Sequence, residues 1–122
     1  MKLLVCGTRT TKCPNAYLQL VCTALRQFWE YKVEEGMSFE IIEGCCPSSA
    51  DEYAEIWANK HNIKLNHFPS TTGNYLKRNI EMVEIADEVL AFWDGWSYGT
   101  AHTIANAVMK GIPVQVVKIN GK

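Results

Sequence analysis

The chain has 122 residues, 48% of them hydrophobic and 20% charged, a composition that excludes a disordered chain and suits one globular domain over residues 1–122. Its 12 basic and 13 acidic residues leave a net charge of −1, which disfavours nucleic acid as a partner. No apolar run approaches membrane-spanning length, so we expect no membrane partner and a cytoplasmic protein.

The first half of the chain alternates apolar runs with helical patterns. Residues 2–6 predict a strand, and Asn15 is a suitable N-cap for the helix that follows. The apolar residues of that helix recur at spacings of three and four: Leu18, Val21, Cys22, Leu25, Phe28 and Trp29. Residues 39–43 predict a second strand. Ser49 then begins a capping-box pattern, and the helix that it opens is expected to turn one face inward, with Tyr53, Ile56 and Trp57.

The second half repeats this alternation. Residues 63–68 predict a weaker strand, and a third helix begins at about Asn74, with its inward side chains expected to be Leu76, Ile80 and Val83. Residues 89–93 predict a buried strand, and residues 101–110 predict a fourth helix with one face formed by Ile104, Ala107 and Val108. Residues 112–117 predict a fifth strand, which Pro113 places at a sheet edge.

Five strands alternating with four helices predict parallel pairing through right-handed crossovers, a Rossmann-like three-layer α/β/α sandwich with a five-stranded parallel sheet. In such sheets ligands bind beyond the carboxyl ends of the strands. This rule directs attention to three loops, at residues 7–13, 44–49 and 94–100.

The five cysteines do not form a recognisable metal or disulfide pattern. Cys6 falls in the first predicted strand and Cys22 on a helix face, positions that do not suit a disulfide framework. Adjacent Cys45 and Cys46, with Cys13 far away, lack the spacing of a zinc site. We therefore expect a reducing compartment, no bound metal and no cofactor, and His61 and His67 look incidental.

The loop at residues 94–100 joins a predicted strand to a predicted helix. Such a junction directs free backbone N–H groups and a helix dipole outward, which favours a phosphate or another anion. Gly99 and Thr100 are either the centre of this phosphate site or simply a tight turn and an N-cap. Trp96 and Tyr98 are suited to stacking on a base or to forming a subunit interface, so a homo-oligomer is one expectation.

Four short motifs occur in order along the chain: VCGTR at residues 5–9, GCCPSSAD at 44–51, KRNIEM at 77–82 and DGWSYGT at 94–100. This set resembles the SLOG superfamily of Rossmannoid nucleotide-binding proteins, in particular its small YspA/cpYpsA-related branch. The resemblance covers nearly the whole chain. It implies a sheet ordered 3-2-1-4-5 and a ligand that is a nucleotide or a phosphate-bearing derivative of one.

The chain departs from the family pattern at two places. Cys45 and Ser49 stand where relatives tend to have glycine, which limits how closely a ligand approaches that loop. Thr103 stands where phosphoribohydrolases and nucleoside deoxyribosyltransferases of this type carry a catalytic Glu. A non-catalytic binding module is therefore the leading expectation. The alternatives are an enzyme acting at the N-glycosidic bond, with Asp94, Glu81 or His102 as catalytic candidates, and a structural module whose pocket is blocked.

The candidate ligand-binding residues come from all four motifs. Arg78 either holds a phosphate or ribose, or is a solvated helix charge or forms a salt bridge with Glu81 or Asp87. Asp51 either contacts a polar ligand or complements its helix dipole. Asp94 suits a ribose hydroxyl, a metal or the shaping of its own turn. The complete candidate set is Gly7, Thr8, Arg9, Gly44, Asp51, Arg78, Asn79, Asp94, Gly95, Ser97, Gly99 and Thr100.

Overall fold

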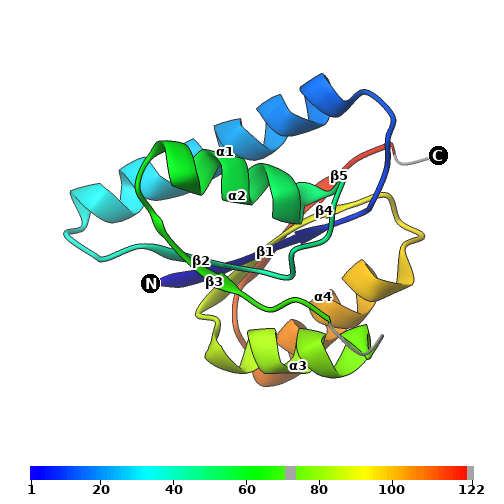
Figure 1. The fold of residues 1–122 in the computed structure, drawn as a ribbon. Helices are drawn as coiled ribbons and strands as arrows, with labels where there is room; N and C mark the ends of the chain where they lie inside the picture. Colours follow the sequence, from blue (N-terminus) through cyan, green and yellow to red (C-terminus); the bar gives the residue numbers. More distant parts are fainter. Residues whose placement is uncertain (71–73, 121–122) are drawn as a thin grey trace.

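Five strands and four helices alternate along the computed structural model, which describes residues 1–70 and 74–120 (Figure 1). The strands are β1 (Lys2–Gly7), β2 (Glu40–Glu43), β3 (Lys64–His67), β4 (Glu88–Trp93) and β5 (Val114–Lys118). The helices are α1 (Pro14–Glu34), α2 (Ala50–Lys60), α3 (Tyr75–Ile85) and α4 (Tyr98–Lys110). Every predicted element is present, with ends that differ from the prediction by a few residues.

The strands form one parallel sheet in the order β3-β2-β1-β4-β5, which confirms the predicted Rossmann-like architecture. Helices α1 and α2 cover one face of the sheet and α3 and α4 cover the other (Figure 1). Strand β5 lies at an edge, as its preceding proline predicted. At the other edge, the register of β2 and β3 pairs Glu43 with His67, so the last residues of these two strands lie side by side.

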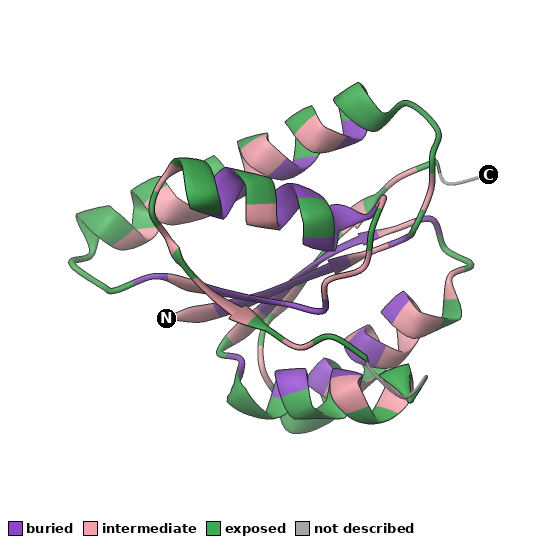
Figure 2. Cartoon of the chain, in the orientation of Figure 1, coloured by how far each residue is buried: buried purple, intermediate pink, exposed green. Residues whose placement is uncertain are grey.

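Alternate side chains of the central strands fill two separate cores. Leu3 and Val5 of β1 pack beneath α1 and α2, whereas Leu4 and Cys6 pack against α3 and α4. All four side chains are buried, and the central strands are the most continuously buried part of the ribbon in Figure 2. This two-sided burial is why the strands read as continuous apolar runs rather than alternating ones.

The predicted cap at Ser49 is confirmed and the one at Asn15 is wrong, while Asn74, the predicted start of the third helix, is a cap as well. The Ser49 hydroxyl accepts the Asp51 N–H at 3.2 Å, and the Asn74 side chain accepts the Lys77 N–H at 3.3 Å. Asn15, the predicted cap of the first helix, lies within that helix instead. The chain turns earlier, at Cys13, because Pro14 is preorganised for the first helical position.

Three apolar side chains predicted to face inward are exposed instead: Ile56, Ile80 and Val108. Small or polar residues take some of the inward positions of these helices, beside large buried side chains such as Trp57 and Met82. In α3, Asn79 is buried and donates its side-chain N–H to the Gly99 carbonyl at 3.3 Å; in α4, buried Thr103 donates to the same carbonyl at 3.2 Å. An apolar pattern cannot identify such positions, because hydrogen bonds rather than hydrophobicity make their burial favourable.

Two side chains join neighbouring elements through hydrogen bonds at opposite ends of the molecule. The Tyr17 hydroxyl of α1 donates to the Thr8 carbonyl at 2.8 Å and accepts the Ala50 N–H at 3.2 Å, which joins α1, the end of β1 and the start of α2. The Lys110 ammonium, at the end of α4, donates to three carbonyls near the end of α3, those of Val83, Glu84 and Ala86.

Candidate functional site

A cavity of about 450 Å³ lies at the carboxyl edge of the sheet, where β1 and β4 end. This is the edge at which ligands bind in open parallel sheets. Of the twelve ligand-binding candidates, nine line it: Gly7, Thr8, Arg9, Asp51, Arg78, Asn79, Ser97, Gly99 and Thr100. Gly44, Asp94 and Gly95 lie outside its wall.

The first turn of α4 forms one side of the cavity. Its first intrahelical bond runs from the Ala101 N–H to the Ser97 carbonyl at 3.1 Å, so the N–H groups of Tyr98, Gly99 and Thr100 have no acceptor within the helix. Ser97 makes no side-chain capping bond to this turn. Gly99 and Thr100 both face the cavity. The turn therefore presents donors and the positive end of a helix dipole, the combination that suits an anion.

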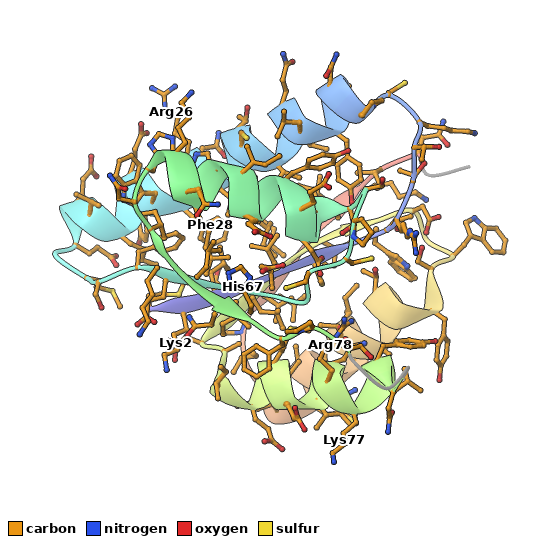
Figure 3. All side chains as sticks on the ribbon, in the orientation of Figure 1. Lys2, Arg26, Phe28, His67, Lys77 and Arg78 are labelled. Carbon is orange, nitrogen blue, oxygen red and sulfur yellow. The ribbon has the colours of Figure 1, made fainter. Side chains whose placement is uncertain are left out.

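Arg78 reaches the opposite side of the cavity from α3. Its Nη1 donates to the Gly44 carbonyl at 3.0 Å, and its Nη2 donates to the Asn79 side-chain oxygen at 3.1 Å. Its Nε is buried and has no hydrogen-bond partner among residues 1–70 and 74–120. In Figure 3, Arg78 points from α3 toward the sheet, whereas the neighbouring Lys77 points away from it. The guanidinium is thus held in a fixed place while its Nε–H is unused among the described residues.

Asp51 organises the loop after β2 from the first turn of α2. Its Oδ2 accepts the N–H groups of Gly44 at 3.0 Å and Cys46 at 3.4 Å. The residue is only 5% exposed. Burial, reinforced by the nearby charge of Glu43, raises the pKa of the Asp51 carboxyl to about 6. Asp51 therefore serves the loop structurally and also borders the cavity with a carboxyl that titrates near neutral pH.

Asp94 shapes the turn between β4 and α4. Its Oδ1 accepts the N–H groups of Trp96 and Ser97, both at 2.9 Å. Burial raises the pKa of Asp94, but these N–H bonds and the hydroxyls of Thr8 and Ser97 together outweigh burial and leave the pKa below its ordinary value. Gly95 has a φ of +88°, a backbone conformation that favours glycine. These hydrogen bonds show that Asp94 shapes its own turn, one of the three roles predicted for it.

Gly44 is required by packing within the loop. A Cβ placed on it would lie 2.9 Å from the Arg78 guanidinium carbon and 3.0 Å from Asp51 Oδ2. The glycine therefore allows Arg78 and Asp51 to close over the loop backbone. Packing within the loop thus accounts for this glycine, which does not line the cavity.

The two side chains that stand where proteins of the resembled superfamily tend to have glycine do not line the cavity. The Ser49 hydroxyl donates to the Cys46 carbonyl at 2.7 Å, and Cys45 Sγ lies 3.4 Å from the Glu43 carboxylate. Both side chains are thus engaged within their own loop. The cavity wall is formed on this side by Cys46 and Asp51.

The three catalytic candidates also lie outside the cavity wall. Asp94 is engaged by its turn, and Glu81 lies on an exposed part of α3 beside a smaller hollow. His102 contacts Asn106 through Nε2 at 3.3 Å, while its Nδ1 is buried without a partner among the described residues. Thr103, at the position where the resembled enzymes carry a glutamate, does line the cavity but donates its hydroxyl to the Gly99 carbonyl.

Sequence reasoning missed Tyr75, which lines the cavity from the first position of α3. Its ring lies 3.5 Å from the point where a Cβ on Gly99 would be, so it faces the first turn of α4. Tyr98 lines the cavity as well, and Trp96, its partner in the prediction, does not. Helices α3 and α4 lie side by side with their first turns at this edge. A residue at the start of α3, such as Tyr75, could therefore have been predicted to face the start of α4.

Comparison of the chain with models of known protein families and with curated proteins finds no match. Over residues 1–70 and 74–120, no helix is both long and apolar enough to cross a membrane.

Proposed function

We propose that the protein binds a nucleotide or a phosphate-bearing derivative of one in the cavity at the carboxyl edge of the sheet. The observation that carries this proposal is the placement of the Arg78 guanidinium, with a buried unused donor, across the cavity from the open first turn of α4. A fixed cation opposite free backbone N–H groups is complementary to a phosphate. The proposal agrees with the SLOG-like motifs of the chain.

The rest of the cavity fits the remainder of such a ligand. Its volume of about 450 Å³ lies within the roughly 300–1,000 Å³ typical of small-molecule sites. Arg9 adds a second cation, and Tyr75 and Tyr98 offer aromatic rings for a base. Thr8 and Ser97 supply hydroxyls, which bond to each other at 3.0 Å and are suited to hold ribose oxygens.

Replacing Arg78 by alanine should weaken binding of a nucleoside phosphate by roughly 10- to 100-fold, because hydrogen bonds to a charged group contribute about 1.5–3 kcal/mol. Native mass spectrometry and calorimetry with nucleoside mono- and diphosphates, ADP-ribose and cyclic nucleotides would measure this. Lys77→Ala is the matched control, since it removes the same charge one position away on a side chain directed away from the sheet. We expect its affinity to stay within about threefold of wild type.

Equal losses in the two variants would contradict the proposal, because they would reflect net charge alone. Failure of the wild-type protein to bind any member of the panel would also contradict it. Circular dichroism and the midpoint of urea unfolding of each variant show whether a loss of binding comes from a loss of folding.

An enzyme acting at the N-glycosidic bond is the second candidate function, and the Asp51 carboxyl is the observation that favours it. A carboxyl in a cavity wall with a pKa of about 6 suits general acid–base chemistry. The same samples should then release free base, and Asp51→Asn should abolish this release. Binding of intact nucleotide without free base would leave the binding module as the function.

We also propose that the protein is cytoplasmic and forms a homo-oligomer. A nucleotide ligand and five free cysteines agree with the cytoplasm. The exposed rings of Trp96 and Tyr98 beside the cavity suit contact with a second copy of the chain. Sedimentation of wild type and of Tyr98→Ala, with and without ligand, tests that assembly.

A further inference from the structure

Three potential metal ligands converge on the far side of the loop that follows β2. Glu43 ends β2, His67 ends β3, and the parallel register of the two strands places them directly opposite each other. Cys45, two residues beyond Glu43, turns its thiol back toward both. Figure 3 shows His67 near the middle of the molecule, on the segment that β3 contributes. Two strand ends and one loop thus supply a carboxylate, an imidazole and a thiol.

The spacing of their donor atoms is close to that of a tetrahedral metal site. Cys45 Sγ lies 3.4 Å from Glu43 Oε1 and 3.5 Å from His67 Nδ1, and the latter two atoms are 2.5 Å apart. Zinc bonds of about 2.3 Å to sulfur and about 2.0–2.1 Å to nitrogen and oxygen would place such atoms roughly 3.3–3.6 Å apart. Two of the three separations already match. A bound ion would need to widen only the contact between the carboxylate and the imidazole.

The burial of Glu43 provides a separate argument. The side chain is 0% exposed, and the only salt-bridge partner that the described residues give it is His67. Its Oε2 accepts the Cys45 N–H at 2.6 Å. A buried carboxylate is costly unless it is paired or coordinates a metal, and here the salt-bridge partner among the described residues is an imidazole that is itself half-exposed.

The backbone of Cys45 adds a third observation. Its φ of +60° lies in the left-handed region, where a residue with a Cβ is strained by about 1–2 kcal/mol and glycine is not. A glycine would therefore be the more stable residue at this position. The strained backbone nevertheless carries a side chain whose sulfur meets the other two donors, which is the pattern expected when the side chain is needed for function.

We propose that Glu43, Cys45 and His67 bind one divalent transition-metal ion, best matched by Zn²⁺, through Oε1, Sγ and Nδ1, with the fourth position open to water. This inference goes beyond the proposed nucleotide site and does not depend on it. Binding displaces the thiol proton of Cys45 to solvent, and it requires His67 to carry its ring proton on Nε2. No electron is transferred, since Zn²⁺ has no redox chemistry.

The proposed ion would bear on the cavity through the loop it holds. Cys46, the next residue after Cys45, lines the cavity, and Asp51 binds the N–H groups on either side of Cys45. A metal bond to Cys45 would fix this loop against β3. The loop that forms one wall of the cavity would then be held by the metal ion on one side and by Asp51 on the other.

The test is a titration of the full chain, stripped of metal under reducing conditions, with Zn²⁺ and Co²⁺. We expect one Zn²⁺ per chain in competition with a chromophoric chelator, and a thiolate-to-Co²⁺ charge-transfer band with Co²⁺. Cys45→Gly is the informative variant, because glycine relieves the left-handed backbone while removing the sulfur. It should fold at least as stably as wild type, lose the charge-transfer band and weaken Zn²⁺ binding by more than about 10-fold.

His67→Ala removes a second ligand from a half-exposed position and should weaken Zn²⁺ binding to a similar degree. The controls are Cys46→Ser and Cys13→Ser, which remove thiols outside the cluster and should leave affinity and spectrum unchanged. Absence of Zn²⁺ binding by the folded wild-type protein would mean that the cluster is a buried ion pair only, and would overturn the proposal. Equal affinity of wild type and Cys45→Gly would overturn it too.

Discussion

Replacing Gly7 by alanine should destabilise the protein by about 3 kcal/mol or more. A Cβ at this position would lie 2.6 Å from the Tyr17 hydroxyl oxygen, 2.9 Å from the Ala50 Cβ and 2.9 Å from the Phe92 carbonyl oxygen. Overpacking of a core costs about 1–3 kcal/mol, and displacing the Tyr17 hydroxyl also weakens the two hydrogen bonds it makes to the layers around it. Urea unfolding of wild type and variant would measure the loss.

Gly99→Ala is the control for this prediction. It makes the same chemical change at another residue of the cavity wall, but among the described residues the added Cβ meets only the Tyr75 ring, at 3.5 Å. Its stability should change by less than about 1 kcal/mol. In combination with Tyr17→Phe, the Gly7 substitution should cost less than the sum of the two single changes, because the closest clash is then gone. Simple additivity, or a Gly7→Ala protein as stable as wild type, would contradict this account.

Asp51→Asn should change the dependence of stability on pH. The pKa of Asp51 is about 6 in the folded protein against an ordinary value of 3.8, so folding favours its protonated form. Its contribution to the free energy of unfolding is therefore fully present below pH 3.8 and is lost as the pH rises through 6. The shift corresponds to roughly 3 kcal/mol. Between about pH 4 and pH 7, wild type should lose this much relative to the asparagine variant, whose oxygen can still accept the N–H groups of Gly44 and Cys46.

The control is Asp94→Asn, because the contribution of Asp94 to stability changes with pH in the opposite direction. The folded pKa of Asp94 lies below its ordinary value, so its contribution is present above pH 3.8 and is lost as the pH falls through the folded pKa. Urea unfolding of the three proteins at a series of pH values would show both effects. Glu43, Cys6, Cys46 and Arg78 lie near Asp51 in every variant, so the effect of Asp51 is measured as the difference between the pH profiles of the proteins. Parallel profiles for wild type and Asp51→Asn would show that this carboxyl ionises freely in the folded state.

The fold was predictable because the same alternation of apolar strand and amphipathic helix recurs along the whole chain. Two-sided burial makes β1 and β4 read as apolar runs, and strands that alternate with helices leave few topologies open. The strand order came from the family resemblance. Three of the errors concern which face of a helix a residue lies on. Ile56, Ile80 and Val108 continue an apolar pattern, yet they are exposed while neighbouring residues are buried.

The candidate site was predictable in its loops but not in its geometry. Motif positions placed Arg78 and the turn before α4 at one edge of the sheet. They could not show that Asp94 serves its own turn or that Tyr75 faces the cavity. The cluster of Glu43, Cys45 and His67 escaped notice because its members have no zinc-type spacing along the chain. They meet only through the register of β2 and β3, which the sequence does not display.

The attachment of Lys110 to the end of α3 has a mechanical consequence for the cavity. Both α3 and α4 begin at the cavity and end at the opposite edge of the sheet, where one ammonium holds three carbonyls of the chain leaving α3. At the cavity end, the hydrogen bond that spans the two helices runs from Asn79 to the Gly99 carbonyl. Separation of the helices is therefore resisted far more strongly at the distant end. If the two helices separate, we expect them to pivot about Lys110, so that Tyr75 and Tyr98 at the cavity move furthest apart.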